Sequence, residues 1–288
     1  MTLKNDFTLE HKMSDGPCVL NALTFDVEEW FQTVLFNRDN HPSRGSLRNN
    51  VLEILDLLDT YKVQATFFIS AVTAESYTFL VKQIHARGHE IASHGYHHRS
   101  VYTLPPRIFK DDVSRSLDVL SGITGAKVIG YRAPTWSIFR KMVWAVDVLE
   151  QLGLKYDSSI YPASKNIFVC KGLPISPYHL KGGLIEFPPP VFSWMGYNIP
   201  FAGGTFLRFF SEDFIKTKLL NINHKGMPAL VYFHSWEFDH ALPSGGIPSW
   251  KKIVQYGNLR TVKGKLIFLL ENFRFTSVRD VLQGMRLI

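Results

Sequence analysis

Short apolar runs alternate with amphipathic segments along the first half of this chain. Residues 19–25 are mostly apolar, and residues 46–61 then carry leucine, valine and isoleucine at helical spacing. A second apolar run over 63–69 is followed by a helical pattern over 74–87. Strands that alternate with helices of this length are typical of parallel sheets joined by crossover helices. The pattern therefore predicts an α/β fold.

The same alternation continues through the middle of the chain. It predicts strands over 90–93, 128–134 and 153–162, with helices over 105–122 and 142–152. Each strand is short and ends near a polar residue. We therefore expect one parallel sheet with its helices on the outside.

The last part of the chain has a different character. Residues 162–204 are rich in proline and glycine, with aromatic residues interleaved, and this composition predicts loops. A helix over 214–221, a strand over 229–234 and a helix over 263–273 follow.

The domain organisation follows from length and from the polar start of the chain. Residues 1–17 are polar and charged without periodicity, which predicts a flexible N-terminal arm. A chain of 288 residues is long enough for a single barrel, and on length alone two smaller domains are as plausible. We expect one domain over 18–288.

Composition excludes several classes of function. The net charge of +7 is scattered, with no run of five basic residues, so we expect no nucleic-acid partner. Cys18 and Cys170 cannot form a disulfide framework. No secretory signal or membrane-spanning apolar stretch is visible, which predicts a cytoplasmic protein, with peripheral contact to a membrane surface left open.

Chemically capable side chains stand at the ends of five of the predicted strands. They are Asp26, Glu28 and Glu29, then His94 and His98, then Arg132, Asp157 and His234. The carboxyl ends of neighbouring parallel strands meet at one edge, so we expect these groups to share a rim. The i,i+4 spacing of His94 and His98 would place both rings on one face of a helical turn, toward a single metal ion.

These groups are the components of a metal-assisted hydrolase. One acid and the histidine pair would hold the ion, and a second acid would take a proton from the attacking water. A separate histidine would protonate the leaving group.

Five segments, in chain order, resemble the motifs of polysaccharide deacetylases with the NodB homology domain, carbohydrate esterase family 4. They are residues 24–28, 94–98, 132–134, 156–158 and 232–234. The resemblance covers about 18–280 and is nearest to the branch found in exopolysaccharide biosynthesis loci. It implies a distorted, incomplete (β/α)7-type barrel with a C-terminal extension. It also implies removal of acetyl groups from N-acetylated sugars of a bacterial surface polysaccharide or its precursor.

The resemblance implies one divalent metal ion held by Glu28, His94 and His98. Zinc is the first expectation, and cobalt or nickel are alternatives. The family more often has adjacent aspartates in its first motif, so Glu29 is a rival to Glu28 as the carboxylate ligand.

The resemblance also implies the catalytic roles. Asp26 would be the general base and Arg132 would hold it. His234 would be the general acid, oriented by Asp157.

We expect three aromatic side chains beside the motifs, Tyr131, Trp136 and Trp236, to contact an N-acetylated sugar or polysaccharide substrate. The alternatives are an O-acetyl esterase or small-molecule amidohydrolase on the same fold, or a non-catalytic glycan-binding module.

Overall fold

The computed structural model covers five stretches of the chain. They are residues 19–32, 46–139, 142–162, 173–239 and 249–288. The arm expected over 1–17 and both cysteines lie outside these stretches. Among the described residues, no helix has the length and apolar character needed to cross a bilayer.

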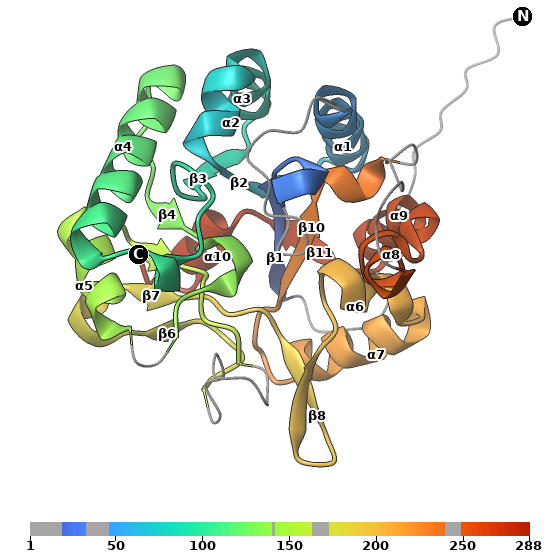
Figure 1. The fold of residues 1–288 in the computed structure, drawn as a ribbon. Coiled ribbons are helices and arrows are strands. Elements are labelled where there is room, and N and C mark those ends of the chain that lie inside the picture. The colour runs from blue at the N-terminus through green and yellow to red at the C-terminus, as the bar shows by residue number, and fades with distance from the viewer. Residues whose placement is uncertain (1–18, 33–45, 140–141, 163–172, 240–248) are drawn as a thin grey trace, which may run out of the picture.

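A nine-stranded sheet forms the centre of the molecule. Across the sheet the order is β10 (Leu230–His234), β1 (Leu20–Val27), β2 (Thr66–Ile69), β3 (Glu90–Ser93), β4 (Gly130–Tyr131), β5 (Tyr156–Asp157), β7 (Ile185–Glu186) and β6 (Tyr178–His179), while β11 (Arg274–Thr276) also pairs with β1. All pairs are parallel except β6 with β7. The sheet curls into a half-barrel (Figure 1), which confirms the predicted α/β fold and incomplete barrel.

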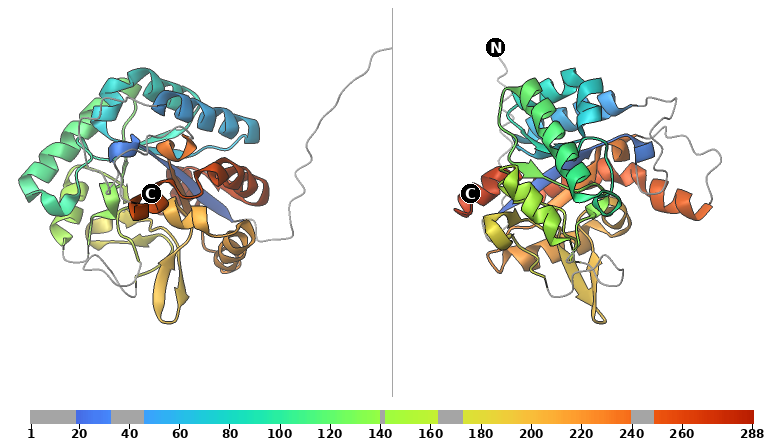
Figure 2. Two further views of the ribbon diagram at one scale, coloured as in Figure 1. Left: turned by 45° about the vertical axis from the view of Figure 1, so that its right-hand side comes forward. Right: turned by 60° about the vertical axis from the view of Figure 1, so that its left-hand side comes forward.

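Helices surround the sheet (Figures 1 and 2). They are α1 (Leu47–Tyr61), α2 (Ala71–Ser76), α3 (Thr78–Ala86), α4 (Pro106–Thr124), α5 (Val143–Gln151), α6 (Gly204–Phe209), α7 (Glu212–Asn223), α8 (Ser249–Tyr256), α9 (Val262–Asn272) and α10 (Val278–Gly284). The single helix expected over 74–87 is two, because the chain leaves helical geometry at Tyr77 (φ −128°, ψ 42°). Short 3₁₀ turns follow several strands, notably η1 (Trp30–Gln32), η3 (Pro134–Trp136) and η5 (Ser235–Phe238).

The segment predicted as loops contains extended structure where it is described. Besides β6 and β7 it forms a hairpin of β8 (Val191–Trp194) and β9 (Tyr197–Pro200), which projects from the body in Figure 1. Met195 and Gly196 turn the hairpin in the left-handed region, with φ of 48° and 78°. A two-residue turn of this hand matches the twist of paired strands. The sequence analysis did not predict this turn, because the proline-rich composition of the segment favoured loops.

A stack of aromatic rings fixes the first two strands against β10. The Phe25 ring lies between Phe67 and Phe233, with centroid distances of 5.1 and 5.8 Å, and all three are fully buried. This packing holds the three strands that carry or flank the acidic motif. The core therefore sets the geometry of the rim above it.

We expect Phe25→Ala to lower the free energy of unfolding by about 3–5 kcal/mol, because it leaves a cavity between two rings that cannot close fully. Urea denaturation followed by circular dichroism measures the change. Ile108→Ala is the control, since Ile108 is 44% exposed on α4 and its loss should cost less than about 0.5 kcal/mol. Equal effects of the two changes would contradict this account of the core.

Candidate active site

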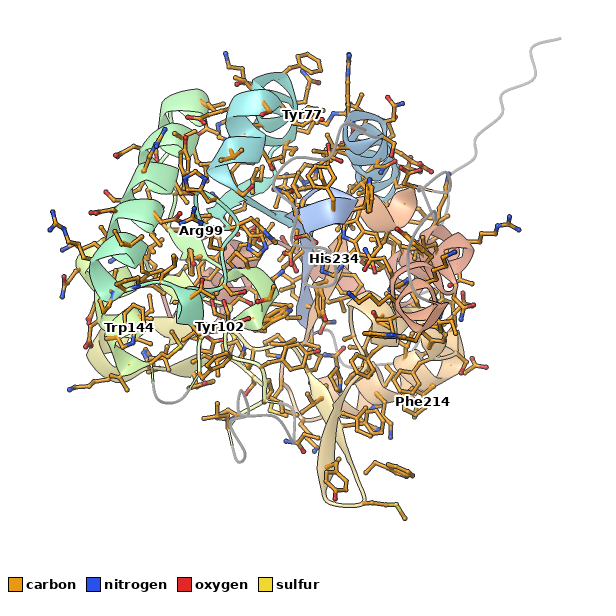
Figure 3. The ribbon with its side chains drawn as sticks, in the orientation of Figure 1. Tyr77, Arg99, Tyr102, Trp144, Phe214 and His234 are labelled. Atoms are coloured by element: carbon orange, nitrogen blue, oxygen red, sulfur yellow. The ribbon has the colours of Figure 1, made fainter. Side chains whose placement is uncertain are left out.

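The carboxyl ends of the strands surround a cavity of about 320 Å³. Side chains from six segments of the sequence line it, including Asp26, Glu28, His94, His98, Trp136 and His234. The parallel register explains this convergence, since Asp26 on β1 lies level with His234 on β10. Figure 3 shows His234 near the middle of the molecule. The rim expected from the sequence exists for these residues.

Glu28, His94 and His98 form a cluster that can hold a metal ion. All three are buried, and one ligand atom from each lies within 4.8 Å of the others. His94 uses Nδ1 to contact the backbone oxygen of Arg132 at 2.7 Å, which leaves Nε2 as its free nitrogen. His98 Nε2 lies 2.6 Å from Glu28 Oε2 and has no hydrogen-bond partner elsewhere among the described residues. Two imidazoles and a carboxylate fit a divalent ion such as zinc and leave a position for water.

The protonation states of these groups also fit a metal site. Burial alone would raise the pKa of Glu28, but His98, His234 and His94 outweigh it and lower that pKa below its usual value. Burial, together with the neighbouring His98, holds the pKa of His94 well below its usual value. An ionised carboxylate and a neutral imidazole are the forms that bind a metal ion.

A loop, not a helical turn, brings the two histidines together. β3 ends at Ser93, and Gly95 and His98 have left-handed φ values of 74° and 56°. Asp112 on α4 anchors the loop by accepting the backbone N–H of Tyr96 at 2.7 Å. The helical interpretation of the i,i+4 spacing was therefore wrong, because Gly95 turns the chain out of helical geometry. The rings still lie 4.9 Å apart.

The structure separates the two candidate carboxylates. Glu28 points into the cavity and joins the histidine cluster. The Glu29 carboxylate instead accepts a hydrogen bond from the Tyr77 hydroxyl at 2.9 Å. Of the two, Glu28 is placed as the ligand candidate.

Asp26 is held by a fully buried arginine. Arg132 Nη1 donates to Asp26 Oδ1 at 2.6 Å and to the Thr24 hydroxyl at 3.0 Å, while Nη2 donates to the Ser158 hydroxyl at 3.1 Å. The guanidinium also lies 3.9 Å from the centre of the Phe68 ring. The predicted contact between Arg132 and Asp26 is present, and it fixes the carboxylate at the cavity wall.

His234 faces the metal cluster with one nitrogen and a carboxylate with the other. Its Nε2 lies 3.9 Å from Glu28 Oε1, and its Nδ1 lies 3.3 Å from Glu237 Oε2. Burial alone would lower the pKa of His234, but Glu237, with smaller effects from Glu28 and Asp26, raises that pKa to about 9. A protonated imidazole at neutral pH can act as a general acid.

The expected contact between Asp157 and His234 is wrong. In the sheet, β1, β2, β3 and β4 lie between the strands of these two residues. Asp157 is fully buried and accepts the Ser159 hydroxyl, and it lies level with Glu186 on β7. Burial raises the pKa of Asp157 to about 7 and that of Glu186 well above its usual value.

Sequence analysis missed Glu237. It follows His234 by three residues on the turn η5, where its carboxylate accepts the His234 backbone N–H at 2.9 Å. An acid three residues after the end of a strand could have been recognised as a capping residue.

The three aromatic residues expected to contact substrate have different positions. Trp136 lines the cavity and has a left-handed φ of 54°, as does the preceding Thr135 at 60°. Trp236 also lines the cavity, but its indole N–H donates to Glu28 Oε1 at 3.0 Å. Tyr131 is 1% exposed and packs edge-on against Phe109, so it is a core residue and its expected substrate contact is wrong.

The fold and the cavity define a class of half-barrel α/β proteins with carboxylates and histidines gathered around one cavity at the carboxyl ends of the strands. Residues 17–156 match the family model described as polysaccharide deacetylase. Residues 158–283 match a domain of unknown function, DUF3473. Residues 17–156 therefore form a polysaccharide deacetylase domain of the NodB type, carbohydrate esterase family 4.

Several known proteins are similar to this chain. A peptidoglycan deacetylase of Helicobacter pylori is 30% identical over 120 residues, which are 41% of this chain and 40% of that protein. This chain thus matches less than half of that relative. A Mycobacterium smegmatis structure described as a polysaccharide deacetylase is 21% identical, with a TM-score of 0.63 over 94% of this chain and 91% of that one. A family pseudoenzyme from Bacillus anthracis is 13% identical, with a TM-score of 0.51 over 91% of this chain and 65% of that one.

We expect Glu28→Gln to weaken zinc binding by at least about tenfold, because even groups that only support metal ligands act on that scale. Elemental analysis after dialysis, and titration with zinc, measure the loss. Glu29→Gln is the matched control and should keep its zinc, since its carboxylate is engaged with Tyr77. Loss of zinc in Glu29→Gln alone would reverse the assignment.

Proposed function

We propose that this chain is a metal-dependent deacetylase that releases acetate from N-acetylated sugars of a bacterial surface polysaccharide or its precursor. The observation that carries the proposal is one cavity that joins the Glu28, His94 and His98 cluster to Asp26 and His234. When bound there, a divalent ion would polarise the acetyl carbonyl and acidify a water molecule. Zinc suits two imidazoles and a carboxylate, and cobalt or nickel are alternatives.

Asp26 is proposed as the general base. Arg132 binds one oxygen of its carboxylate, which leaves the other to accept a proton from the attacking water. Asp26 precedes Glu28 by two residues at the carboxyl end of β1, and both side chains reach the same cavity. The proposed base therefore lies next to the candidate ligand Glu28.

His234 is proposed as the general acid. Its Nε2 would deliver a proton to the amide nitrogen as the bond between carbon and nitrogen breaks, giving acetate and the free amino sugar. The pKa of about 9 means that the ring carries this proton at neutral pH. The cavity is then lined by both the proposed base, Asp26, and the proposed acid, His234.

The substrate class rests on the family and on the cavity walls. The relative from Helicobacter pylori is named for deacetylation of peptidoglycan, an N-acetylated sugar polymer. Trp136 and Phe206 add ring surfaces to the cavity, and rings of this kind pack against sugar faces. The link to exopolysaccharide synthesis, the cytoplasmic location and peripheral membrane contact stay predictions.

The region over 18–288 is proposed to act as one domain. Strands from both matched regions share the sheet, since β10 pairs with β1 and β7 pairs with β5. Although one structural neighbour is a pseudoenzyme, the base, the ligand cluster and the acid are together in this chain, which favours catalysis.

We expect the zinc-loaded protein to release acetate from N-acetylglucosamine oligomers, and Asp26→Asn to lower kcat by about 10²-fold or more while it keeps its zinc. An enzymatic acetate assay with elemental analysis measures both. Asp147→Asn, an exposed change on α5, is the control and should leave kcat unchanged. An inactive wild type after loading with zinc, cobalt or nickel would refute the proposed function.

A further inference from the structure

Two charged side chains stand in a row behind the ring of His234. Glu237 Oε2 lies 3.3 Å from His234 Nδ1, and Glu237 Oε1 lies 3.1 Å from Arg208 Nε. The side chains of Glu237 and Arg208 are each 1% exposed. His234 Nδ1, Glu237 Oε1 and Arg208 Nε make no hydrogen bond elsewhere in the described structure. The two ion pairs are therefore the polar contacts of these three buried atoms.

The far end of the row is fixed to backbone oxygens. Arg208 Nη1 donates to the oxygens of Gln255 and Gly257 at 2.8 and 2.9 Å, and Nη2 donates to that of Val254 at 2.8 Å. These carbonyls belong to the last turn of α8 and the residue just beyond it, where the helix dipole favours a cation. Nη2 also donates to the Thr205 hydroxyl at 3.0 Å, so Arg208 cannot turn away without breaking four hydrogen bonds. Its Nε consequently presents a fixed charge to Glu237.

Glu237 in turn fixes His234 at two points. One oxygen accepts the backbone N–H of His234 at 2.9 Å and lies beside ring atom Nδ1. The Trp236 ring stacks on the imidazole with an interplanar angle of 21° and a centroid distance of 5.5 Å. With Nδ1 turned to the carboxylate, Nε2 is the nitrogen that faces the cavity.

We propose that Arg208 and Glu237 are the positioning pair of this enzyme, and that they hold His234 with Nε2 toward the scissile bond; this inference rests on the proposed function. A carboxylate on one imidazole nitrogen fixes the orientation of the ring and stabilises its charged form. Glu237 and Arg208 thus take the position that the sequence analysis gave to Asp157. Four strands lie between β5 and β10, and Asp157 accepts the Ser159 hydroxyl and lies level with Glu186.

The pair also gives a role to the matched region of unknown function. His234, Glu237, Arg208 and the α8 carbonyls all lie within residues 158–283. Asp26, Glu28, His94, His98 and Arg132 all lie within residues 17–156. The second region thus supplies the complete acid side of the site, from the imidazole back to the helix end that fixes it.

Steady-state kinetics on the zinc-loaded protein test the pair. Glu237→Gln should lower kcat on N-acetylglucosamine oligomers by about 10- to 100-fold, the scale of a lost orienting partner, with KM and zinc content unchanged. On an aryl acetate ester, whose leaving group needs no proton, the loss should be less than about threefold. In a His234→Ala background, Glu237→Gln should cause no further loss, because Glu237 acts only through that ring. A further loss there, or an unchanged kcat in Glu237→Gln alone, would overturn the inference.

Folding is controlled with a second variant. Glu237→Gln leaves Arg208 buried without a counter-charge, so the paired change Glu237→Gln with Arg208→Met removes both charges. It should give the same kinetic pattern in a folded protein. Asp157→Asn is the matched carboxylate control, and a loss confined to kcat on the amide in that variant would return the role to Asp157.

Proton NMR of protein labelled with ¹⁵N-histidine decides the inference without turnover. The wild type should show a slowly exchanging His234 Nδ1 proton, assigned by its absence in His234→Ala. This signal should disappear in Glu237→Gln and persist in Asp157→Asn. The reverse pattern would overturn the inference. If the wild type released no acetate, the proposed function would fail, and the NMR result would still establish whether Glu237 holds His234.

Discussion

The buried guanidinium of Arg132 is the interaction on which the arrangement of the site depends. A cation with no exposed surface must find a carboxylate and several acceptors. Arg132 finds them in Asp26 and Thr24 on β1 and in Ser158, directly after β5. Its own backbone oxygen contacts Nδ1 of His94. One residue therefore orients both the proposed base and a metal-ligand candidate, so the two cannot move independently.

The metal-ligand cluster depends on this same arrangement and on a second support from the opposite side. Trp236 donates its indole proton to Glu28, and Ser235 exchanges hydrogen bonds with the Glu28 backbone. Arg132, directly after β4, thus supports His94, while the turn after β10 supports Glu28. Because Glu28 and His94 are each held by a second group, two of the three candidate ligands are oriented by the protein itself.

The sequence was informative wherever function depends on a strand ending. Apolar runs that stop at Asp26, His94 or His234 placed these residues at one rim, because parallel strands share their direction. Sequence was less informative where the outcome depends on which strands are neighbours. Asp157 follows a strand as expected, but β5 lies beside β7 and far across the sheet from β10, and chain order does not reveal this.

Side chains near tight turns were also hard to predict. Gly95 opens a left-handed turn that converts an apparent helical spacing into a loop, and Glu237 folds back onto the residue three positions before it. Tyr131 beside Arg132 was expected in the cavity, yet successive residues of a strand face opposite sides of the sheet.

The pairing of β1 has a consequence for how the chain is made. Thr24 on β1 donates to the backbone oxygen of Val231 on β10, 207 residues later in the sequence. During synthesis the apolar strand β1 can pair with β2 early, but its other edge waits until most of the chain has left the ribosome. An exposed apolar edge of this kind is a template for wrong association, and such long-range pairing is slow. Chaperone dependence and a late folding step would therefore be concentrated at the same strand that carries the proposed base.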